Sequence, residues 1–271
     1  MKKHRKKLFL GVAILILVGI FAAEEGLLKI KSKAVFCDVG QGDGIFITLE
    51  SKEQILIDGG PDNKMIGCVG EHMPYFDRTI EYMIISHPDK DHFVGAVEVL
   101  KRYNVKHIIL NGDEDSSPEY EEFKKFSKAS AIARAGDNIV LENGQITFFH
   151  PRQKDYFKDS NDNSLVFKFE YGGKSILFTG DISEKIEANL LAVSGVELRS
   201  DIIKISHHGS KTSSGEEFLK TVNPDLAIIS VGADNKFGHP SYRIVKRLEN
   251  LKIQYKRTDE TGNIIVPLYK D

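Results

Sequence analysis

The sequence predicts an α/β fold in which strands end at polar residues and lead into helices. In both halves of the chain, short apolar runs stop at acidic, histidine or glycine residues and are followed by apolar residues at helical spacing. Between these halves, four strand-like segments follow one another without helices, which predicts a second sheet. The 271 residues, 41% of them hydrophobic, are of ordinary globular composition and suffice for one large or two small domains.

The first half of the chain is expected to alternate strands with helices. The apolar segment 81–85 has the composition of a buried strand. After it, apolar side chains recur at helical spacing at Phe93, Val94, Val97 and Leu100. The segment 61–74, which begins and ends with proline, is expected to be a loop. The other expected elements are strands at 33–36, 44–49, 54–57 and 105–110, and a helix at 118–130.

The second half begins with the expected second sheet and then returns to strands followed by helices. The strands of the sheet are expected at 138–141, 146–150, 165–171 and 175–179. Helices at 183–194, 215–222 and 242–251 then alternate with strands at 201–205 and 226–231, and two last strands flank Thr261 and Gly262. Strands that end in polar residues and lead into helices place functional groups at one edge of a sheet.

The N-terminus has the layout of a signal peptide or a membrane anchor. Five basic residues at positions 2–7 precede the apolar run 8–23, and two glutamates follow it. Sixteen residues of helix span roughly 24 Å, slightly less than a bilayer core of about 30 Å. We therefore expect a basic segment at 1–30, as an uncleaved anchor or alternatively a cleaved signal, and a folded domain at 31–271. The expected location is the cell membrane with an extracellular catalytic domain, or secretion.

Charge and cysteine content limit the possible functions further. Without residues 1–23, the chain carries 32 basic and 39 acidic side chains, a net charge of about −7. A protein that grips nucleic acid with its whole surface would be basic, so a polyanionic substrate would have to meet a local patch or bound metal ions. Cys37 lies in a strand-like segment and is expected to be a buried thiol, whereas Cys68 is uninformative. A disulfide between them is possible in an exported protein but is not indicated.

The segment 86–92 (SHPDKDH) carries the strongest chemical signal. His87, Asp89, Asp91 and His92 follow the buried strand in an H-x-D-x-D-H pattern and lie on a strand-to-helix turn. Such a turn directs several side chains into one cavity, where imidazole and carboxylate groups bind divalent metals. Capping of the helix would explain only one of the carboxylates. The pattern therefore predicts a metal site, and two neighbouring ions could share the loop.

Seven motifs in order make the chain after its N-terminal segment resemble the metallo-β-lactamase superfamily, most closely the exported hydrolase domain of ComEC-type DNA-uptake proteins. The motifs are 36–43 (FCDVGQGD), 56–60 (LIDGG), 86–92, 161–166 (NDNSLV), 177–181 (LFTGD), 207–210 (HHGS) and 238–240 (GHP), and the likeness extends to 257–259 (RTD). This resemblance implies a four-layer αβ/βα sandwich with metal ions at the shared edge of its two sheets. Residues 31–271 would then be a metallo-β-lactamase-like hydrolase domain.

The resemblance also implies roles for the ligands of a two-metal site. His87 and Asp89 would hold one ion, Asp91 and His92 the second, and Asp181 would bridge the two. One imidazole of His207 and His208 would complete the second site; the glycine that follows favours His208, although spacing alone does not decide between them.

Two positions depart from the superfamily's commonest pattern. Asp89 stands where a third imidazole is usual, which makes the site richer in oxygen and favours zinc or manganese over zinc alone. Asn161 stands roughly where another histidine would be expected, and His150 is a possible substitute for that ligand.

The chemistry expected of this site is hydrolysis. A metal-bound water whose pKa is lowered towards neutrality would be the nucleophile, so no serine or cysteine nucleophile is needed. Asp91 and His239 are the candidate catalytic residues. His239 would donate a proton or contact phosphate on the substrate side, with a structural turn histidine as the alternative. The candidate substrate-binding residues are Asn161, Asn163, Ser210 and Lys211.

We therefore expect an exported metal-dependent hydrolase, in first place a phosphodiesterase or nuclease acting on DNA or nucleotides. The resemblance is the basis for predicting a phosphodiester substrate, whereas the ligand cluster itself predicts only hydrolysis. The alternatives are a phosphocholine or teichoic-acid phosphodiesterase, for which the acidic net charge leaves room, and a non-catalytic binding module that contains metal. The N-terminal segment predicts a membrane as partner, and no protein partner is inferred.

Overall fold

The computed structural model describes residues 31–127, 129–193 and 198–269, together with Gly11. The expected signal or anchor segment at 1–30 lies outside the described residues, apart from Gly11. Within the described part of the chain, no helix is long and apolar enough to cross a membrane.

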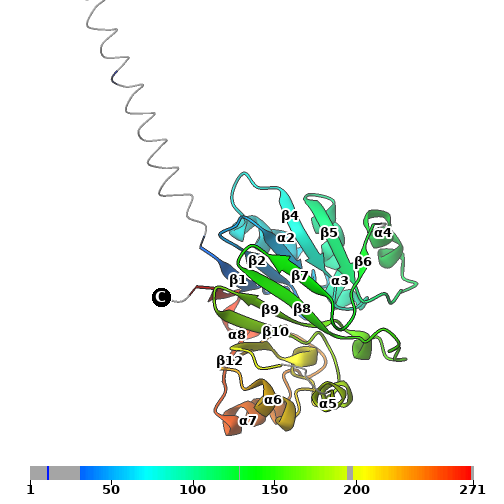
Figure 1. The fold of residues 1–271 in the computed structure, drawn as a ribbon, viewed down its shortest axis with the longest axis vertical. Coiled ribbons are helices and arrows are strands. Elements are labelled where there is room, and N and C mark those ends of the chain that lie inside the picture. Colours follow the sequence, from blue (N-terminus) through cyan, green and yellow to red (C-terminus); the bar gives the residue numbers. More distant parts are fainter. Residues whose placement is uncertain (1–10, 12–30, 128, 194–197, 270–271) are drawn as a thin grey trace, which may run out of the picture.

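Two mixed seven-stranded sheets form the centre of the fold (Figure 1). The first sheet has the order β14-β1-β2-β3-β4-β5-β6, and the second has the order β13-β12-β11-β10-β9-β8-β7. The strands of the first sheet are β1 (Lys33–Phe36), β2 (Ile45–Thr48), β3 (Gln54–Ile57), β4 (Thr79–Ile84), β5 (Asn104–Leu110), β6 (Ala131–Ile132) and β14 (Ile264–Pro267). Those of the second are β7 (Asn138–Leu141), β8 (Gly144–His150), β9 (Val166–Tyr171), β10 (Lys174–Phe178), β11 (Ile202–Lys204), β12 (Leu226–Ile229) and β13 (Gln254–Arg257).

Helices cover the outer face of each sheet, so the molecule has four layers (Figure 1). The first sheet packs against α2 (Lys64–His72), α3 (Lys90–Leu100) and α4 (Pro118–Phe126). The second packs against α5 (Glu184–Ala192), α6 (Glu216–Val222) and α7 (Tyr242–Leu251). Two 3-10 helices, η1 (Asn161–Asn163) and η2 (Ser206–Gly209), and the short α8 (Thr258–Thr261) complete the described elements.

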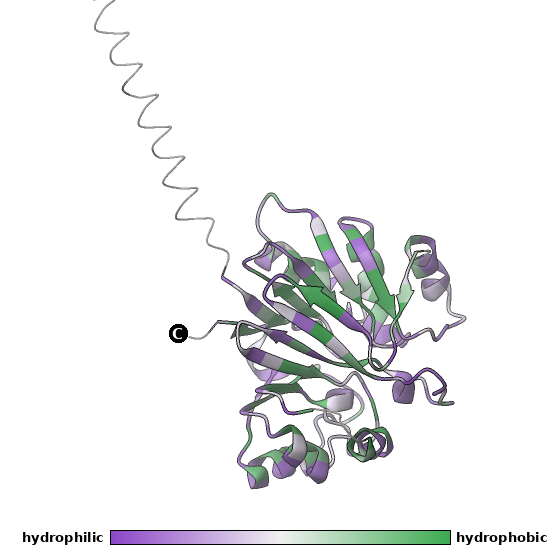
Figure 2. Cartoon of the chain, viewed as in Figure 1, coloured by the Kyte–Doolittle hydropathy of each residue, from purple (hydrophilic) through white to green (hydrophobic). Residues whose placement is uncertain are grey.

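Three apolar cores hold these layers together. The core between the sheets contains Phe36, Phe167 and Phe178, and one further core lies under the helices on each side. Alternate residues of a strand face opposite sides of its sheet, so strands buried on both faces are almost continuously apolar, as the hydropathy colouring shows (Figure 2). The predicted α/β sandwich is confirmed, and the predicted strands and helices agree with the structure to within a few residues.

One predicted loop is wrong, because the segment 61–74 contains the helix α2. Met65, Cys68 and Val69 form its buried face at helical spacing. Gly67 and Gly70 lie on the exposed side, and glycine is a poor helix former. These glycines concealed a helix that is stabilised by packing against the first sheet.

The expectation of a free thiol at Cys37 is also wrong, because Cys37 and Cys68 form a disulfide. Cys37 follows β1 on the face of the sheet that α2 covers, and Cys68 lies on the buried face of α2. The two Cα atoms are 6.1 Å apart, within the usual range for a disulfide. The pairing depends on the packing of α2 across the sheet, which was not expected from the sequence.

The strand order brings polar loops from both sheets to one edge. β3 and β4 are parallel neighbours in the first sheet, and β10 and β11 are parallel neighbours in the second. Backbone hydrogen bonds connect the loops at this edge: Leu165 N, just before β9, donates to Ser86 O after β4, and His207 N after β11 donates to Gly180 O after β10. The motifs that follow these four strands therefore meet in one place.

Candidate metal centre

The loop after β4 places the predicted cluster on a strand-to-helix turn. Asp89 is the N-cap residue of α3 and has extended backbone geometry, so His87 lies in the loop whereas Asp91 and His92 lie in the first helical turn. The start of α3 packs closely against the loop after β3, where Gly95 N donates to Gly60 O. A side chain at Gly95 would collide with the backbone oxygen of Gly59. This close approach brings His92 against the loop that carries Asp58.

Three buried imidazoles converge at this edge, and each is oriented through its Nδ1 atom. His92 Nδ1 donates to Asp58 Oδ2 at 2.9 Å, and His208 Nδ1 donates to Ser230 O at 2.9 Å. His87 Nδ1 lies 3.0 Å from Ser86 Oγ, which already donates its own proton to Asp58 Oδ2 and therefore accepts from the imidazole. The Nε2 atoms of all three rings are buried without a hydrogen-bond partner. Outer hydrogen bonds of this kind fix the tautomer in which Nε2 is free to bind a metal.

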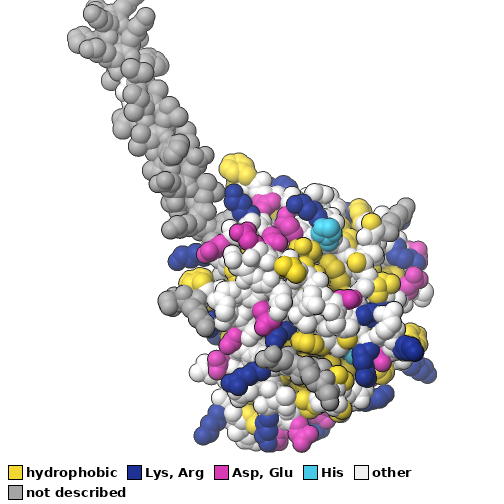
Figure 3. All heavy atoms as spheres, viewed as in Figure 1, with side chains coloured by type: hydrophobic (Ala, Val, Ile, Leu, Met, Phe, Trp, Pro, Cys, Tyr) yellow, Lys and Arg dark blue, Asp and Glu magenta, His cyan; other side chains and the backbone are white. Residues whose placement is uncertain are grey.

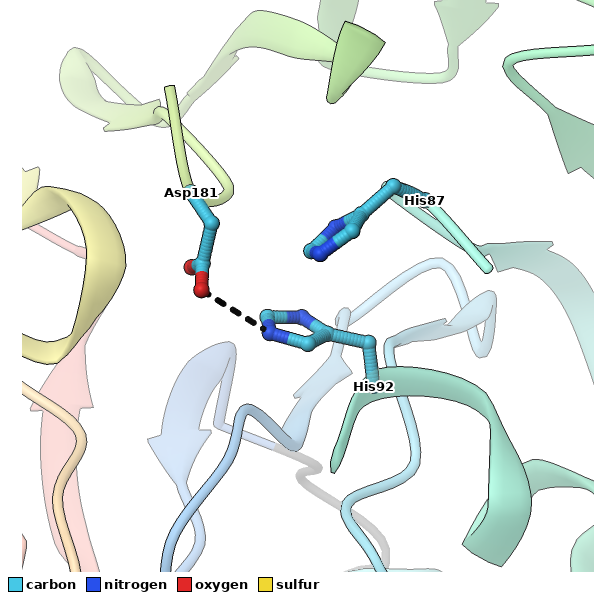
Figure 4. A group of neighbouring side chains, drawn as sticks. All are labelled: His87, His92 and Asp181. Atoms are coloured by element: carbon cyan, nitrogen blue, oxygen red, sulfur yellow. Dashed lines mark ion pairs between the residues drawn. The ribbon is translucent and has the colours of Figure 1, made fainter. Parts of the chain in front are cut away.

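Carboxylates face the three free nitrogens. Asp181 Oδ2 lies 3.4 Å from His92 Nε2 and 3.3 Å from His208 Nε2. Asp91 Oδ2 lies 3.4 Å from His208 Nε2. Figure 4 shows Asp181 pointing towards His92 from the second sheet, with the ring of His87 beside them. Asp89 is more exposed, and its Oδ2 lies 3.8 Å from His87 Nε2.

These residues form adjoining groups whose ligand atoms lie within 4.8 Å of one another. One group is His87, His92 and Asp181, and another is Asp91, His92 and His208. Zinc and manganese bind ionised carboxylates and the Nε2 atoms of imidazoles, and an imidazole gives up its Nε2 proton when it binds the metal. The unpartnered nitrogens show that these residues fit a metal, since each would otherwise be a buried polar atom without compensation.

The electrostatics of the centre are dominated by buried charge. Burial alone would lower the pKa of His92, but the carboxylates of Asp181, Asp58 and Asp91 raise it well above its usual value. The pKa of His208 is likewise raised, against the effect of burial, by Asp181. Burial would raise the pKa of Asp181, but the charges of the two histidines and of Lys204 hold it well below the usual value. The site thus holds carboxylates in the ionised form that metal binding requires.

Lys204 and Asp43 belong to this charge network and were not expected from the sequence. Lys204 is 1% exposed and forms an ion pair with Asp43, which is also buried. Its Nζ lies 3.5 Å from Asp181 Oδ1 and donates to Gly180 O. Asp43 Oδ1 lies 3.4 Å from His208 Nδ1. The available signals were a lysine inside the apolar run 202–205 and the acid that ends the glycine-rich motif 36–43.

Asp58 is a third residue whose role the sequence did not reveal. Its carboxylate accepts hydrogen bonds from Ser86 N and Ser86 Oγ, both at 2.7 Å, in addition to His92 Nδ1. Asp58 therefore connects β3 to the cluster loop and orients His92. The signal was its position at a strand end before two glycines, of which Gly59 lets α3 approach.

The two histidines of η2 differ in their surroundings. His208 is 1% exposed and its Nε2 faces both Asp91 and Asp181. His207 is 30% exposed on its side chain, and its Nε2 lies 3.9 Å from Asp181 Oδ2. Both have positive φ angles, 50° for His207 and 53° for His208, so the backbone turns sharply and directs the rings apart.

The candidate substrate-binding residues lie in different settings. Asn163 is buried, and its amide accepts from Phe157 N and donates to Phe157 O, so it braces the loop before η1 rather than facing a substrate. Ser210 is also buried and its hydroxyl contacts Thr212. Asn161 is partly exposed in η1, and Lys211 is exposed beside the histidine loop.

The remaining two candidate histidines, His150 and His239, take separate positions. His150 Nε2 donates to Asp162 O at 2.8 Å, and among the described residues His150 belongs to none of the candidate metal groups. Its predicted use as a substitute ligand has no counterpart in the structure, because its nitrogen holds the loop before β9. The His239 ring stands 5.8 Å from the ring of His207, and burial, with the charges of His207 and His208, lowers the pKa of His239 to about 4.

Comparisons with known proteins agree with this geometry. Residues 37–233 match the family described as "Metallo-beta-lactamase superfamily". The chain is 29% identical over 248 residues to ComE operon protein 3 of Bacillus subtilis, covering 84% of this chain and 32% of that protein. It is 31% identical over 239 residues to Recombination protein 2 of Haemophilus influenzae, covering 86% of this chain and 28% of that protein. The chain thus spans about a third of the length of these relatives.

Solved structures share the fold at low sequence identity. One is Tm1679, described as a metal-dependent hydrolase of the beta-lactamase superfamily, with a TM-score of 0.59 and 13% identity over 87% of this chain and 99% of that one. Another is the metallo-beta-lactamase fold protein YhfI of Bacillus subtilis, with a TM-score of 0.57 and 10% identity over 86% of this chain and 99% of that one.

Proposed function

Because the chain belongs to the metallo-beta-lactamase superfamily, we propose that it is a metal-dependent hydrolase that cleaves phosphodiesters, with DNA or nucleotides as its substrates. The observation that carries the proposal is the set of free Nε2 atoms on His87, His92 and His208, each fixed through Nδ1 and facing ionised carboxylates.

The choice of phosphodiester rests on the relatives. One is named Recombination protein 2, and a third relative, of Neisseria gonorrhoeae, is named Competence protein ComA. With ComE operon protein 3, they resemble this chain at about 30% identity over most of its length. The face in Figure 3 mixes Lys and Arg with Asp and Glu and has no continuous basic band. Because the chain after residue 23 carries a net charge of about −7, contact with a phosphodiester would be local, at the metal centre and the loops around it. Uptake of DNA is not part of the proposal, because the chain spans only about a third of these relatives.

The ligands would be shared between two metal ions in the way expected from the sequence. His87 and Asp89 would hold one ion, Asp91, His92 and His208 the second, and Asp181 would contact both. Two divalent ions, zinc or manganese, would supply a water of lowered pKa and polarise the phosphoryl oxygen.

The chain's own residues would keep this geometry in place. Asp58 holds the ring of His92, Ser230 O holds that of His208, and Lys204 neutralises the side of Asp181 that faces away from the histidines. Asp91 faces the open side of the centre, where a reacting water would lie, because its side chain is partly exposed. His239, beyond His207, would contact the leaving group.

The disulfide supports export of the folded domain. Disulfides persist in oxidising compartments and are rare in the cytosol, so the Cys37–Cys68 bond fits a domain outside the cytoplasm. We propose that residues 1–30 anchor the domain at the cell membrane on its outer face, with secretion as the other outcome of the test. Protease added to intact cells should digest the domain if it is anchored outside, and the culture medium should contain it if it is secreted. Export would be contradicted if the domain resisted the added protease in intact cells and its cysteines reacted with an alkylating agent without prior reduction.

The central experiment combines metal analysis with activity on bis-p-nitrophenyl phosphate and single-stranded DNA. The wild type should bind metal and hydrolyse both, whereas Asp181→Ala and His208→Ala should lose metal and activity. Asp225→Ala and His107→Ala, at exposed positions away from the centre, are the matched controls. A wild type that binds metal but cleaves neither substrate would refute the nuclease proposal. p-Nitrophenylphosphocholine is tested as a third substrate, and activity on it alone would identify a phosphocholine esterase. Full activity in Asp181→Ala would exclude a bridging role for Asp181.

A further inference from the structure

A rigid loop beside the metal centre holds an aromatic ring out into solvent. Phe237 lies between β12 and α7 and is 70% exposed. Asn235 fixes this loop, since its Nδ2 donates to Gly232 O and His239 O, both at 2.7 Å, and its Oδ1 accepts from His239 N at 2.9 Å. The position of Phe237 is therefore set by side-chain hydrogen bonds within the loop, while most of its surface is exposed.

A chain of ring contacts connects Phe237 to the centre. The rings of Phe237 and His239 are stacked, with centroids 5.8 Å apart and planes inclined by 21°. His239 in turn contacts His207 edge to face, at 5.8 Å. His207 Nε2 lies 3.9 Å from Asp181 Oδ2. Phe237 thus stands two imidazoles away from the proposed bridging carboxylate.

A second exposed ring and unpaired positive charge lie beside this loop. Tyr242 is 75% exposed at the start of α7, which is tied to the histidine loop because Ser241 N donates to Gly209 O at 2.9 Å. Lys236 and Lys211 are exposed and form no ion pair with any described residue. Within the loop, Asp234 is the one carboxylate and Lys236 the one lysine, and Lys211 lies in the neighbouring loop after η2. Aromatic rings with lysines beside them suit a ligand that has flat apolar faces and negative charge.

We propose that Phe237 is a stacking subsite for an unpaired nucleobase next to the scissile phosphate, so that the substrate of this centre is single-stranded nucleic acid. This inference rests on the proposed phosphodiesterase function. Aromatic platforms combined with positive charge bind single strands without sequence preference, because every base has a π face and every nucleotide a phosphate. In a duplex the same bases are stacked on one another and do not reach the ring.

The test compares a thymidine oligonucleotide with an abasic oligonucleotide of the same length and phosphate number. Phe237→Ala should raise the KM for the thymidine oligonucleotide about tenfold, which corresponds to about 1.4 kcal/mol, and leave the KM for the abasic one unchanged. Phe237→Trp should restore the wild-type KM. Fluorescence anisotropy measures the affinity of the metal-free protein for the thymidine oligonucleotide as a second readout. This affinity should be weaker by a similar factor in Phe237→Ala. The KM for a hairpin duplex should be the same in the wild type and in Phe237→Ala.

Phe76→Ala is the matched control. Phe76 is 93% exposed, but it lies in the loop before β4, whereas the centre lies beyond the other end of that strand. If Phe237→Ala changed the KM for both oligonucleotides equally, or for neither, the stacking subsite would be refuted even though the enzyme remained a phosphodiesterase. If the wild type cleaved neither oligonucleotide, the proposed function itself would fail. The two failures are therefore distinguishable.

Discussion

Removal of the positive charge at Lys204 tests the charge network of the centre most directly. Lys204 is buried between Asp43 and Asp181, which are 2% and 3% exposed. In Lys204→Met the side chain keeps much of its volume, but the lysine charge between two buried carboxylates is lost. Breaking a buried ion pair on one side costs about 3–5 kcal/mol. At about 2–4 °C per kcal/mol for a domain of this size, the melting temperature should fall by roughly 6–20 °C.

The assay is thermal unfolding followed by circular dichroism, first in EDTA and then with zinc or manganese. Metal ions bound at Asp181 would supply positive charge where Lys204 did, so part of the loss should be recovered on adding metal. Lys106→Met is the control, because Lys106 forms an exposed ion pair with Glu81 at 3.1 Å. Such a pair contributes about 0–1 kcal/mol. If Lys204→Met in EDTA melted no lower than the Lys106→Met control, the network described for the centre would be wrong.

Three further outcomes are expected. Burial raises the pKa of Glu187 to about 7 from 4.5, so the folded state binds the proton more tightly than the unfolded state does. The free energy of unfolding should therefore fall by about 3 kcal/mol as pH rises from 4.5 to 7. Urea titrations at several pH values should show this fall, and Glu187→Gln should reduce it. The Cys37–Cys68 bond closes a loop with a separation of 31 residues, which predicts about 3–4 kcal/mol of stabilisation; dithiothreitol should lower the melting temperature of the wild type but not of the double alanine variant, and an insensitive wild type would argue against the disulfide. Asp58→Asn should weaken metal binding roughly 10–100-fold by loosening His92, as measured by calorimetry; unchanged affinity, equal to that of an Asp225→Asn control, would remove Asp58 from the site.

Several local features could be predicted because their causes lie within a few residues. The strand-to-helix turn at 86–92 follows from an apolar run, a proline and an N-cap aspartate in sequence. The alternation of strands and helices after residue 174 follows from hydrophobic periodicity. The helix α2 could not be predicted in this way, because its exposed glycines weaken the local signal and packing against the first sheet supplies the missing stability.

The partners of the cluster depend on contacts between distant segments. The sequence by itself determined which side chains carry ligand chemistry, and the ordered motifs up to residue 210 indicated that they act together. Only the tertiary structure decided that Asp58 orients His92, that Lys204 and Asp43 form a buried pair behind Asp181, and that Cys37 meets Cys68. The physical reason is that burial and charge compensation depend on how two sheets and their helices pack, whereas composition and spacing describe only neighbours along the chain.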